Sequence, residues 1–542
     1  MAPEVISSFL QALPFNHPCL PKLPRRMPLP LIICRSGQSE PHGSGPASPT
    51  PGQVFLERQD SVRTAKLLIK EFNKDRKKGR AIKDKASKVT PSAGPSCYGC
   101  GAPLQTSESD APGYVDRDTF ELKKKHHQLR TLICRRCKLL SHGHMLTAVG
   151  GNGGYSGGKQ FITAEELREK LLHLRKEKAL IVKLVDIVDF NGSFLSRIRD
   201  LVGANPIILV VTKVDLLPRE TNFNCIGDWI VESTMKKKLN VTSVHLTSSK
   251  SLVGITGVVS EIQKEKRGRD VYILGSANVG KSAFISALLR VMAERDPVAA
   301  AAQRYKPVES AVPGTTLGPI QIEAFFGGGK LYDTPGVHLY HRQAAVVHAK
   351  DLPALAPQSR LKGQKFTLST AGDQYSSMNG LSIFWGGLVR IDLVKIPPGT
   401  HLTFYGPKTL QIHAVHSDEA DEFYQANLGR LLTPPTGPET AKDWRGLDSE
   451  RQLLIRYDEL DRPACDVAIS GLGWVAVEPR SSGNPESVLE EMEKELKFSV
   501  RVPRPVEIFV RPPLPVGKAG AEWYQYRELT DKEAETRPKW NF

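Results

Sequence analysis

The sequence lacks any apolar run long enough to cross a membrane. No segment approaches the roughly 18 to 20 uninterrupted apolar residues that span a bilayer. Hydrophobic residues still make up 40% of the 542 residues, which is enough for several domains with cores of their own. We therefore expect a folded, soluble protein without stable membrane insertion.

Cysteine is also scarce, which argues against a secreted protein stabilised by disulfide bonds. The chain has eight cysteines, and only four of them form close pairs, at 97–100 and 134–137. The others are scattered at Cys19, Cys34, Cys225 and Cys465. This distribution favours a reducing compartment and a metal site.

Acidic residues are nearly absent from the first fifty positions. This segment has ten prolines, six serines and four Lys or Arg, and its only acids are Glu4 and Glu40. An acid-poor, basic leader that contains serine is typical of an organelle transit peptide, although an ordinary disordered tail has a similar composition. Composition alone separates a chloroplast from a mitochondrial destination poorly.

The whole chain is short of negative charge, with a formal net charge of +16 and a pI near 9.3. Residues 57–88 carry twelve Lys or Arg against five acids, and their apolar residues recur at helical spacing. A basic amphipathic helix can lie on rRNA, and a solvated helix or tail fits the same pattern equally well. The charge favours polyanionic partners such as RNA or ribosomes without identifying one.

From about residue 180 the sequence alternates apolar, β-rich runs with helix-length segments. The runs are 179–190, 205–215, 243–249, 270–276 and 330–336. Near-continuous apolar strands separated by helices predict a parallel sheet that is covered on both faces. Ligands of such sheets bind at the carboxyl ends of the strands, where each nucleotide motif described below is located.

The flanking segments differ from this pattern. A glycine-rich run at 148–159 has no strand leading into it and predicts a linker. Thr163 and Glu166 then predict a capping box that starts a helix. Residues 352–380 have the composition of a connector, and from 381 onward strand-like runs separated by Gly and Pro predict a separate, mainly β domain.

Residues 275–282, GSANVGKS, match the phosphate-binding pattern G-x-x-x-x-G-K-[ST] in full. A strand-like run precedes them and a helical run follows, which is the context that the pattern requires. The glycines let backbone amides face phosphate oxygens, the lysine supplies positive charge at the β- and γ-phosphates, and the serine can ligate Mg²⁺. The residues concerned are Gly275, Ser276, Ala277, Asn278, Val279, Gly280, Lys281 and Ser282.

Two downstream motifs complete a nucleoside triphosphate site. DTPG comprises Asp333, Thr334, Pro335 and Gly336. Its carboxylate is placed to hold Mg²⁺ through water, and its glycine amide can meet the γ-phosphate. In PGTTLG, at 313–318, either Thr315 or Thr316 is the switch threonine that contacts Mg²⁺.

TKVD, at 212–215, predicts guanine as the base of the nucleotide. The carboxylate of Asp215 can accept two hydrogen bonds, from guanine N1–H and the N2 amine, a donor pair that adenine lacks. Thr212 opens the motif, and Lys213 would lie along the base and the phosphate loop. A second element, SSK, comprises Ser248, Ser249 and Lys250 and would support guanine O6 through backbone amides.

The order of these motifs is unusual. GTPases usually begin with the phosphate loop, whereas here TKVD and SSK precede it and PGTT and DTPG follow. The termini of a compact domain often lie close together, so the same sheet can form from a chain that is cut elsewhere. The order predicts a circularly permuted GTPase domain. In it, the segment after DTPG runs directly into the C-terminal domain, so that nucleotide state could reposition that domain.

The glutamine that many GTPases use to orient water is missing. It usually follows the glycine of the DTPG-like motif, and here that position is Val337. Valine cannot orient water, so slow intrinsic turnover is expected.

CYGC and CRRC form a CxxC…CxxC pattern with 33 residues between the pairs. This gap is longer than the roughly 15 to 20 residues of a zinc ribbon, but two such knuckles can still close a structural zinc site. We expect Zn²⁺ on Cys97, Cys100, Cys134 and Cys137. A redox pair is an alternative, as is substitution by one of His126, His127, His142 and His144. The surrounding residues are basic and would face RNA phosphates or serve solubility; they are Lys123, Lys124, Lys125, Arg130, Arg135, Arg136 and Lys138.

Together these motifs resemble the YqeH-type circularly permuted GTPases and, more closely still, their plant nitric-oxide-associated members in plastids. The resemblance is carried by CYGCGAPLQTS, KKKHHQLRT, VDIVDFNGSF, TKVDLLP, GSANVGKSAF, PGTTLGPIQI, LYDTPGVH and WGGLVRIDLV, and covers about residues 95–542. It implies GTP-dependent assembly of the small ribosomal subunit with binding to its rRNA, here in the chloroplast stroma, with the mitochondrion as the alternative. The family name refers to a claimed nitric oxide synthase activity, for which we find no haem, flavin or NADPH motif.

The resemblance also implies how hydrolysis is catalysed. We expect Lys281, Asn278, Thr315 and Thr316 to act in it. In GTPases with a hydrophobic residue in place of the glutamine, an asparagine at the position of Asn278 often ligates K⁺. K⁺ and a macromolecular partner are therefore the expected activators, although many residues are tolerated at that loop position and one ligand assigns a metal weakly.

We expect six parts: a transit peptide (1–50), a basic, partly helical or disordered segment (51–95), a zinc-binding module (96–147), a circularly permuted α/β P-loop GTPase domain (160–345), a linker (346–380) and a β-rich C-terminal domain (381–542). The resemblance implies that the last of these binds RNA or peptide.

Two other functions stay open. One is a zinc-dependent RNA-binding regulatory switch with negligible turnover and no role in ribosome assembly. The other is a metabolic enzyme that uses the nucleotide, for which Asp186 and Asp189 are the only further candidates; we place them in a strand end and its turn.

Overall fold

The computed structural model describes residues 32–35, 95–142, 163–195, 198–303, 316–367, 377–480 and 494–542. Most of the expected transit peptide, the basic helix at 57–88 and the glycine-rich run at 148–159 lie outside these ranges. No helix within the described ranges is long and apolar enough to cross a membrane.

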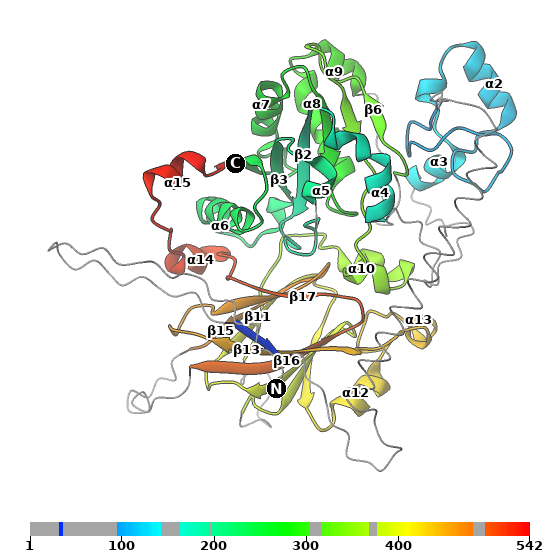
Figure 1. The fold of residues 1–542 in the computed structure, drawn as a ribbon. Coiled ribbons are helices and arrows are strands. Elements are labelled where there is room, and N and C mark those ends of the chain that lie inside the picture. The colour runs from blue at the N-terminus through cyan, green and yellow to red at the C-terminus, as the bar shows by residue number, and fades with distance from the viewer. Residues whose placement is uncertain are drawn as a thin grey trace, which may run out of the picture.

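A seven-stranded sheet, ordered β18-β4-β3-β2-β5-β7-β6, forms the centre of the nucleotide-binding domain (Figure 1). The strands are β2 (Ala179–Asp186), β3 (Ile207–Thr212), β4 (Val241–Leu246), β5 (Asp270–Leu274), β6 (Ile320–Ile322), β7 (Leu331–Asp333) and β18 (Lys539–Asn541). All neighbouring strands are parallel except β6 and β7. The predicted parallel α/β sheet is confirmed, with its strands in the permuted order.

Side chains along β2 alternate between two apolar cores. Leu180, Val182 and Leu184 pack with α7 (Ile255–Lys266) and α8 (Lys281–Ala293). Ile181 and Val185 point to the other face, where α5 (Ile198–Val202) and α6 (Phe223–Met235) lie. Both faces are therefore covered, as the near-continuous apolar strands predict.

The helix α4 (Ala164–Lys170) begins as predicted. Thr163 Oγ1 accepts the Glu166 amide at 3.1 Å, and the Glu166 carboxylate accepts the Thr163 amide at 3.3 Å. Leu167 is buried on this helix, and the chain continues into a 3₁₀ turn (Leu172–Arg175). A short helix α9 (Pro297–Ala302) follows α8, and a 3₁₀ turn (Val214–Leu216) follows β3.

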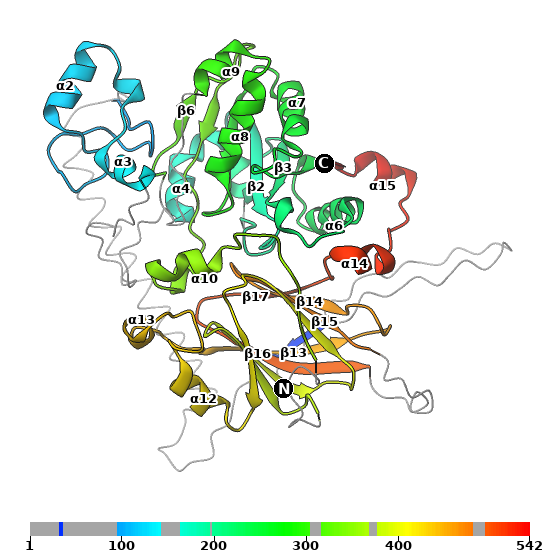
Figure 2. The same ribbon diagram turned by 180° about the vertical axis from the view of Figure 1, so that it is seen from behind.

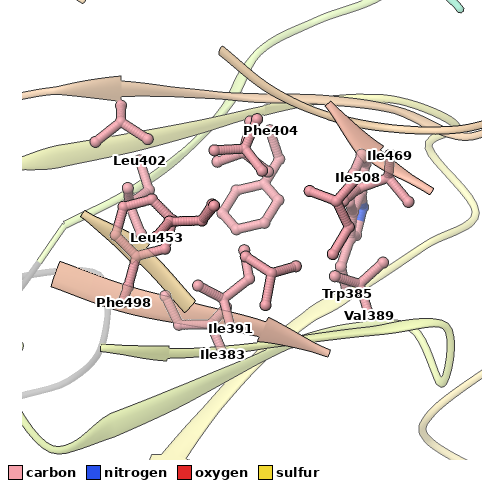
Figure 3. Packing of buried hydrophobic residues seen from close by; sticks show 14 of the residues in the cluster. Ile383, Trp385, Val389, Ile391, Leu402, Phe404, Leu453, Ile469, Phe498 and Ile508 are labelled. Carbon is pink, nitrogen blue, oxygen red and sulfur yellow. The ribbon is translucent and has the colours of Figure 1, made fainter. Parts of the chain in front are cut away.

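The C-terminal domain consists mainly of two antiparallel sheets. The first is ordered β1-β13-β16-β10-β9-β12 and the second β17-β14-β15-β11-β8. Their strands are β1 (Ile32–Arg35), β8 (Gln364–Phe366), β9 (Leu381–Trp385), β10 (Val389–Lys395), β11 (His401–Tyr405), β12 (Ile412–His416), β13 (Ser449–Arg456), β14 (Cys465–Ile469), β15 (Gly473–Glu478), β16 (Glu495–Val502) and β17 (Ile508–Arg511). Side chains from both sheets, among them Trp385, Phe404 and Phe498, fill one apolar core (Figure 3). Helices α12 (Ala420–Asn427) and α13 (Pro438–Lys442) lie beside the sheets, and the predicted β-rich domain is confirmed.

The segment expected to be a linker is partly structured. It contains the end of α10 (Gln343–Val346), a 3₁₀ helix (Ala349–Leu355) and β8, which pairs with β11. Because β8 is an edge strand of a C-terminal sheet, the C-terminal domain includes residues that precede 381, the predicted start of the domain. At the other end, β1 lies within the expected transit peptide and pairs with β13.

The last residues return to the nucleotide-binding domain. After α14 (Gly517–Trp523), α15 (Asp531–Thr536) leads the C-terminus to the side of this domain near α6 (Figures 1 and 2). There β18 adds a parallel strand beside β4. Trp540 packs on Gly227 of α6 so closely that a Cβ there would lie 2.3 Å from the indole. Phe542 stacks on Phe223 with ring centroids 4.2 Å apart. The range predicted for the C-terminal domain, 381–542, therefore ends in a tail that belongs to the central sheet of the nucleotide-binding domain.

The cysteine module contains α2 (Arg117–Lys125), a 3₁₀ turn (Leu129–Thr131) and α3 (Arg135–Ser141). Its small core is built around the four cysteines of the two pairs, with Ala102, Val115, Leu132 and Leu140. Both views place the module beside α4 and β6 of the nucleotide-binding domain (Figures 1 and 2).

Candidate functional site

The phosphate loop joins the carboxyl end of β5 to the first turn of α8. Asn278 and Gly280 have positive φ angles of 62° and 88°, so the chain turns sharply before the helix begins. The first amides of α8 have no partners within the helix and carry partial positive charge. This is the arrangement in which helix N-termini bind phosphate.

Lys281 is folded back onto the phosphate loop. Its side chain is 8% exposed, and Nζ lies 3.5 Å from Gly275 O and 3.4 Å from Ser276 O. Burial lowers the pKa of Lys281 to about 8, and the nearby Asp333 carboxylate opposes that shift. A phosphate beside the ammonium would raise the pKa again, so anion binding would restore the full charge.

The residue after DTPG is bonded to the phosphate loop through the backbone. The Ala277 amide donates to Val337 O at 2.7 Å, and the Val337 amide donates to Gly275 O at 3.2 Å. At Gly336 a Cβ would lie 2.8 Å from Lys281 Nζ, so only glycine fits there without a shift. The Val337 side chain is 1% exposed and packs into an apolar cluster. It cannot orient water, as its identity predicts.

TKVD lies directly against the phosphate loop. Thr212 Oγ1 donates to Val279 O at 2.7 Å. Lys213, at a φ of 65°, places Nζ 2.9 Å from Asn278 O and therefore lies along the loop. Asp215 is half-buried in the turn that follows. The two motifs thus meet at one edge of the sheet, although Thr212 precedes the loop by more than sixty residues.

The SSK element extends this edge. The Val214 amide donates to Thr247 O at 3.2 Å, which joins the TKVD turn to the end of β4. Ser248 is buried, Ser249 is half-buried and Lys250 is exposed. The loop that contains them is therefore adjacent to Asp215, where a base would be read.

Part of the predicted Mg²⁺ ligand set lies within the described residues. Ser282 is half-buried in the first turn of α8, and Asp333 is 1% exposed at the end of β7. Thr316 is 7% exposed, whereas Thr315 lies outside the described ranges. Thr334 fixes the DTPG turn by donating to Ile273 O at 2.6 Å. Asp333 ends β7, which pairs with β5, the strand that leads into the phosphate loop and Ser282. Hydroxyl and carboxylate oxygens are the donors that Mg²⁺ prefers.

Three charged residues contact the nucleotide motifs although the sequence analysis did not predict them as residues of the nucleotide site. Asp186 accepts from Lys213 Nζ at 2.6 Å. Asp189 accepts from Arg342 Nε at 2.8 Å, and Arg342 Nη1 donates to Ala277 O at 2.6 Å. As expected, Asp186 ends β2 and Asp189 lies in the turn that follows it, but both also hold cationic side chains on the nucleotide motifs. Arg342 belongs to no motif, and only the fold brings it to the loop.

The two cysteine pairs meet in one buried cluster. All four Sγ atoms lie within 4.8 Å of one another, with Cys97 and Cys137 3.8 Å apart and Cys100 and Cys134 3.9 Å apart. Tetrahedral zinc with Zn–S bonds of about 2.3 Å requires sulfur atoms about 3.8 Å apart, so the cluster fits Zn²⁺. Cys97 Sγ also accepts the amides of Gly99 and Cys134, at 3.4 and 3.2 Å. Among the described residues, no histidine joins this cluster.

Comparison with known proteins assigns the chain to a family. The family described as "50S ribosome-binding GTPase" matches residues 270–361, and the family described as "YqeH-like, C-terminal" matches residues 399–514. The chain is 63% identical to NO-associated protein 1, chloroplastic/mitochondrial, of Arabidopsis thaliana, and 63% identical to a putative nitric oxide synthase of Oryza sativa subsp. japonica; both alignments cover all of both chains. It is also 31% identical to the uncharacterized protein YqeH of Bacillus subtilis (strain 168), over 77% of this chain and 98% of YqeH. With its GTPase domain and YqeH-like C-terminal domain, this chain therefore belongs to the family of YqeH and NO-associated protein 1.

Proposed function

We propose that this protein hydrolyses GTP to control assembly of the small ribosomal subunit, and that it binds the rRNA of that subunit. GTP and Mg²⁺ follow from the GTPase domain of the family. The ribosomal role rests on one observation: the segment after DTPG contacts both the phosphate loop and the C-terminal domain.

This segment follows DTPG. His341 O accepts the Glu507 amide at 3.0 Å, and the Gln343 amide donates to a carbonyl in the β14–β15 turn at 2.9 Å. Arg342, between them, donates to Ala277 O in the phosphate loop. Because three consecutive residues contact both parts, a shift of this segment on hydrolysis would pass directly to the C-terminal domain. A nucleotide-controlled binding domain is what an assembly factor requires.

Each motif has a role in this proposal. Asp215 reads guanine, and Lys281 neutralises the β- and γ-phosphates. Ser282 and Asp333 hold Mg²⁺, joined in the GTP state by Thr315 or Thr316. Mg²⁺, when bound, would neutralise the negative charge that develops on the transferred phosphoryl group.

K⁺ is the proposed activator within the chain's own site. Asn278 is exposed at the turn of the phosphate loop, and Val337 places no water-orienting side chain at the position where many GTPases have glutamine. A cation beside Asn278 would supply positive charge where other GTPases use an arginine finger. We expect turnover to be faster in K⁺ than in Na⁺ at equal ionic strength, measured as phosphate release; equal rates would remove K⁺ from the proposal.

The cysteine module is the proposed rRNA-binding surface. Residues 117–142 contain eight Lys or Arg against two acids. The helix α2 has no buried residue, and Lys124, Lys125, Arg135 and Lys138 are exposed. Exposed Lys and Arg side chains on a small scaffold ordered by a metal can bind RNA phosphates. RNA binding through such contacts would weaken as the salt concentration rises.

The compartment and the target subunit are also proposed. The Arabidopsis relative is named chloroplastic/mitochondrial, and the acid-poor leader agrees with import, so we place the protein in the chloroplast stroma. One matching family is described as binding the 50S subunit, whereas we propose the small subunit. Both subunits therefore belong in the test.

The experiment is co-sedimentation of the mature protein with purified plastid small and large subunits, in GDP and in a non-hydrolysable GTP analogue. We expect binding to the small subunit with the analogue and release with GDP. The test variant is Lys124→Glu plus Lys125→Glu on the module, and its matched control, Lys518→Glu plus Lys532→Glu on the C-terminal tail, reverses the same number of charges. Only the first pair should weaken binding.

Each other result overturns a stated part of the proposal. Binding to the large subunit alone would replace the target. Binding to free RNA in both nucleotide states, without turnover, would favour the zinc-dependent RNA-binding switch. Absence of binding to either subunit would remove the ribosomal role and leave the GTPase chemistry intact.

A further inference from the structure

The first cysteine knuckle is bonded directly to the segment that ends the switch motif PGTTLG. Cys100 O accepts two amides, from Leu317 at 2.7 Å and from Gly318 at 3.1 Å. Leu317 comes directly after Thr316, one of the two candidate switch threonines. A carbonyl of a metal-binding residue therefore holds the backbone next to the γ-phosphate side of the site.

Two glycines make this contact possible. Gly101 has a φ of 72°, and a Cβ on it would lie 2.5 Å from Gly318 O. A Cβ on Gly318 would lie 2.8 Å from Gly101 O. Both distances are shorter than real Cβ contacts, and the obstructing atoms are backbone atoms that cannot rotate away. The knuckle and the switch segment therefore pack backbone against backbone.

Leu317 is also held from its other sides. Its carbonyl accepts Lys170 Nζ of α4 at 2.6 Å. Its side chain packs against both the cysteine core and the core beneath α4 and α5. On the neighbouring side of the knuckle, Tyr98 packs against the core that contains α7 and α8. The module is thus anchored at several points around the switch segment, beside α4 and β6 (Figure 1).

We propose that the cysteine module is a positioning element of the GTPase site, and that metal binding and GTP binding stabilise each other through the bond between Cys100 and the switch segment. This inference rests on the proposed function, in which Thr315 or Thr316 contacts Mg²⁺ and the γ-phosphate. Cys100 and Gly318 are not among the expected ligands of the nucleotide or of Mg²⁺, so they would act through the position of the threonine.

The coupling has a definite sign and nucleotide dependence. With the metal bound, the knuckle keeps its shape, and the switch segment is already held near its GTP-bound position. Less ordering is then required when GTP binds, so affinity for GTP rises. By reciprocity, GTP tightens metal binding by the same factor. GDP has no γ-phosphate to engage the switch threonine, so it should show little coupling.

The test is Gly318→Ala, which adds one methyl group against Gly101 O without changing a nucleotide or metal ligand. Gly257→Ala in α7 is the matched control, because its Cβ would meet His245 Nδ1 at an ordinary 3.6 Å. In Gly318→Ala we expect the amides at 317 and 318 to exchange hydrogen about tenfold faster, and the ratio of GTP-analogue to GDP affinity to fall about tenfold. Zinc content should stay at that of the wild type, and Gly257→Ala should change none of these quantities.

A second variant addresses the metal itself. Within the described part of the chain, Cys134 makes no hydrogen bond to the switch segment, so Cys134→Ser removes a cysteine without touching that contact. It should release the amides at 317 and 318 in the same way. Unchanged exchange and an unchanged affinity ratio in Gly318→Ala would overturn the inference. Unchanged exchange in Cys134→Ser, with zinc lost, would overturn the coupling to the metal.

These assays contain no ribosomes, so they separate the inference from the proposed function. Failure of the wild-type protein to bind either ribosomal subunit leaves the coupling result standing. If GTP analogue and GDP protect residues 316–322 equally in the wild type, the switch assignment fails, and the inference fails with it.

Discussion

Replacing Asp215 by asparagine is expected to lower GTP affinity by about three orders of magnitude, because one hydrogen bond becomes a donor–donor contact and the other loses its charged acceptor. A carboxylate offers only acceptors to guanine, whose facing edge presents the N1–H and the N2 amine. The asparagine amide would turn a donor toward one of these donors. Xanthine carries a carbonyl oxygen at C2, so its edge presents one donor and one acceptor, and asparagine matches both. The variant should therefore prefer xanthine nucleotides, which titration with labelled GDP and XDP measures.

The control is Asp200→Asn, an equivalent change at a carboxylate that is 55% exposed on α5, away from the TKVD turn. Its nucleotide affinities should match those of the wild type. If Asp215→Asn also keeps wild-type affinity for GDP, then TKVD does not read the base. The permuted GTPase domain would then lack the motif to which we assign its preference for guanine.

The nucleotide motifs could be predicted because their chemistry is local. A phosphate loop needs glycines, a lysine and a hydroxyl within eight residues, and a strand before it with a helix after it. Apolar runs of strand length then imply that the motifs share one sheet edge, whatever their order in the chain. The bonds from Thr212 to Val279 and from Lys213 to Asn278 confirm that TKVD meets the loop.

The residues that join the parts could not be predicted in this way. Arg342 reaches Ala277 and Asp189, but its spacing from DTPG follows no rule. Likewise, the sequence shows Gly318 only as the end of PGTTLG and Gly101 only as the residue after CYGC, and their packing alone shows why neither can carry a side chain. Contacts between elements distant in sequence depend on the assembled fold, which single-sequence patterns do not encode.

The C-terminal tail shows the same limit. KWN is too short and too polar to be recognised as a strand, yet it pairs with β4 as β18. Its position depends on interactions elsewhere, including Trp540 on Gly227 and the bond from Tyr524 to Asp228 at 2.6 Å. The hydrophobic periodicity of a sequence cannot predict a strand that is stabilised by its neighbours rather than by its own composition.

Replacing Arg511 by leucine is expected to destabilise the folded protein by about 3–5 kcal/mol, because it leaves a buried carboxylate without its cation. Arg511 is 3% exposed, and its Nε lies 3.2 Å from Asp466 Oδ2, where Asp466 is 1% exposed. The guanidinium also lies between Trp229 of α6 and Trp474 of β15, at 5.2 and 5.3 Å from their ring centroids. The pair is therefore part of the contact between the two large domains. Urea unfolding followed by tryptophan fluorescence would measure the loss.

The pH dependence separates the charge from the packing. Burial raises the pKa of Asp466 to about 6, against the opposing effect of Arg511, so the folded state binds a proton more tightly than the unfolded state. This group therefore adds stability as pH falls through about 6, and loses it as pH rises. In Arg511→Leu the carboxyl lacks its cation and its pKa is higher still. The destabilisation should then shrink when the pH is lowered from about 7.5 to about 5, because protonation removes the uncompensated charge.

The double variant Arg511→Leu with Asp466→Asn is the decisive comparison. Asparagine keeps an oxygen that can accept the Leu514 amide, which donates to Asp466 Oδ2 at 3.0 Å, but it carries no charge. If the buried charge causes the loss, the double variant should be more stable than Arg511→Leu at neutral pH and should show no such pH dependence. Equal destabilisation of both variants at every pH would instead attribute the loss to the missing contacts with the two tryptophans, and the ion pair would contribute little to joining the domains.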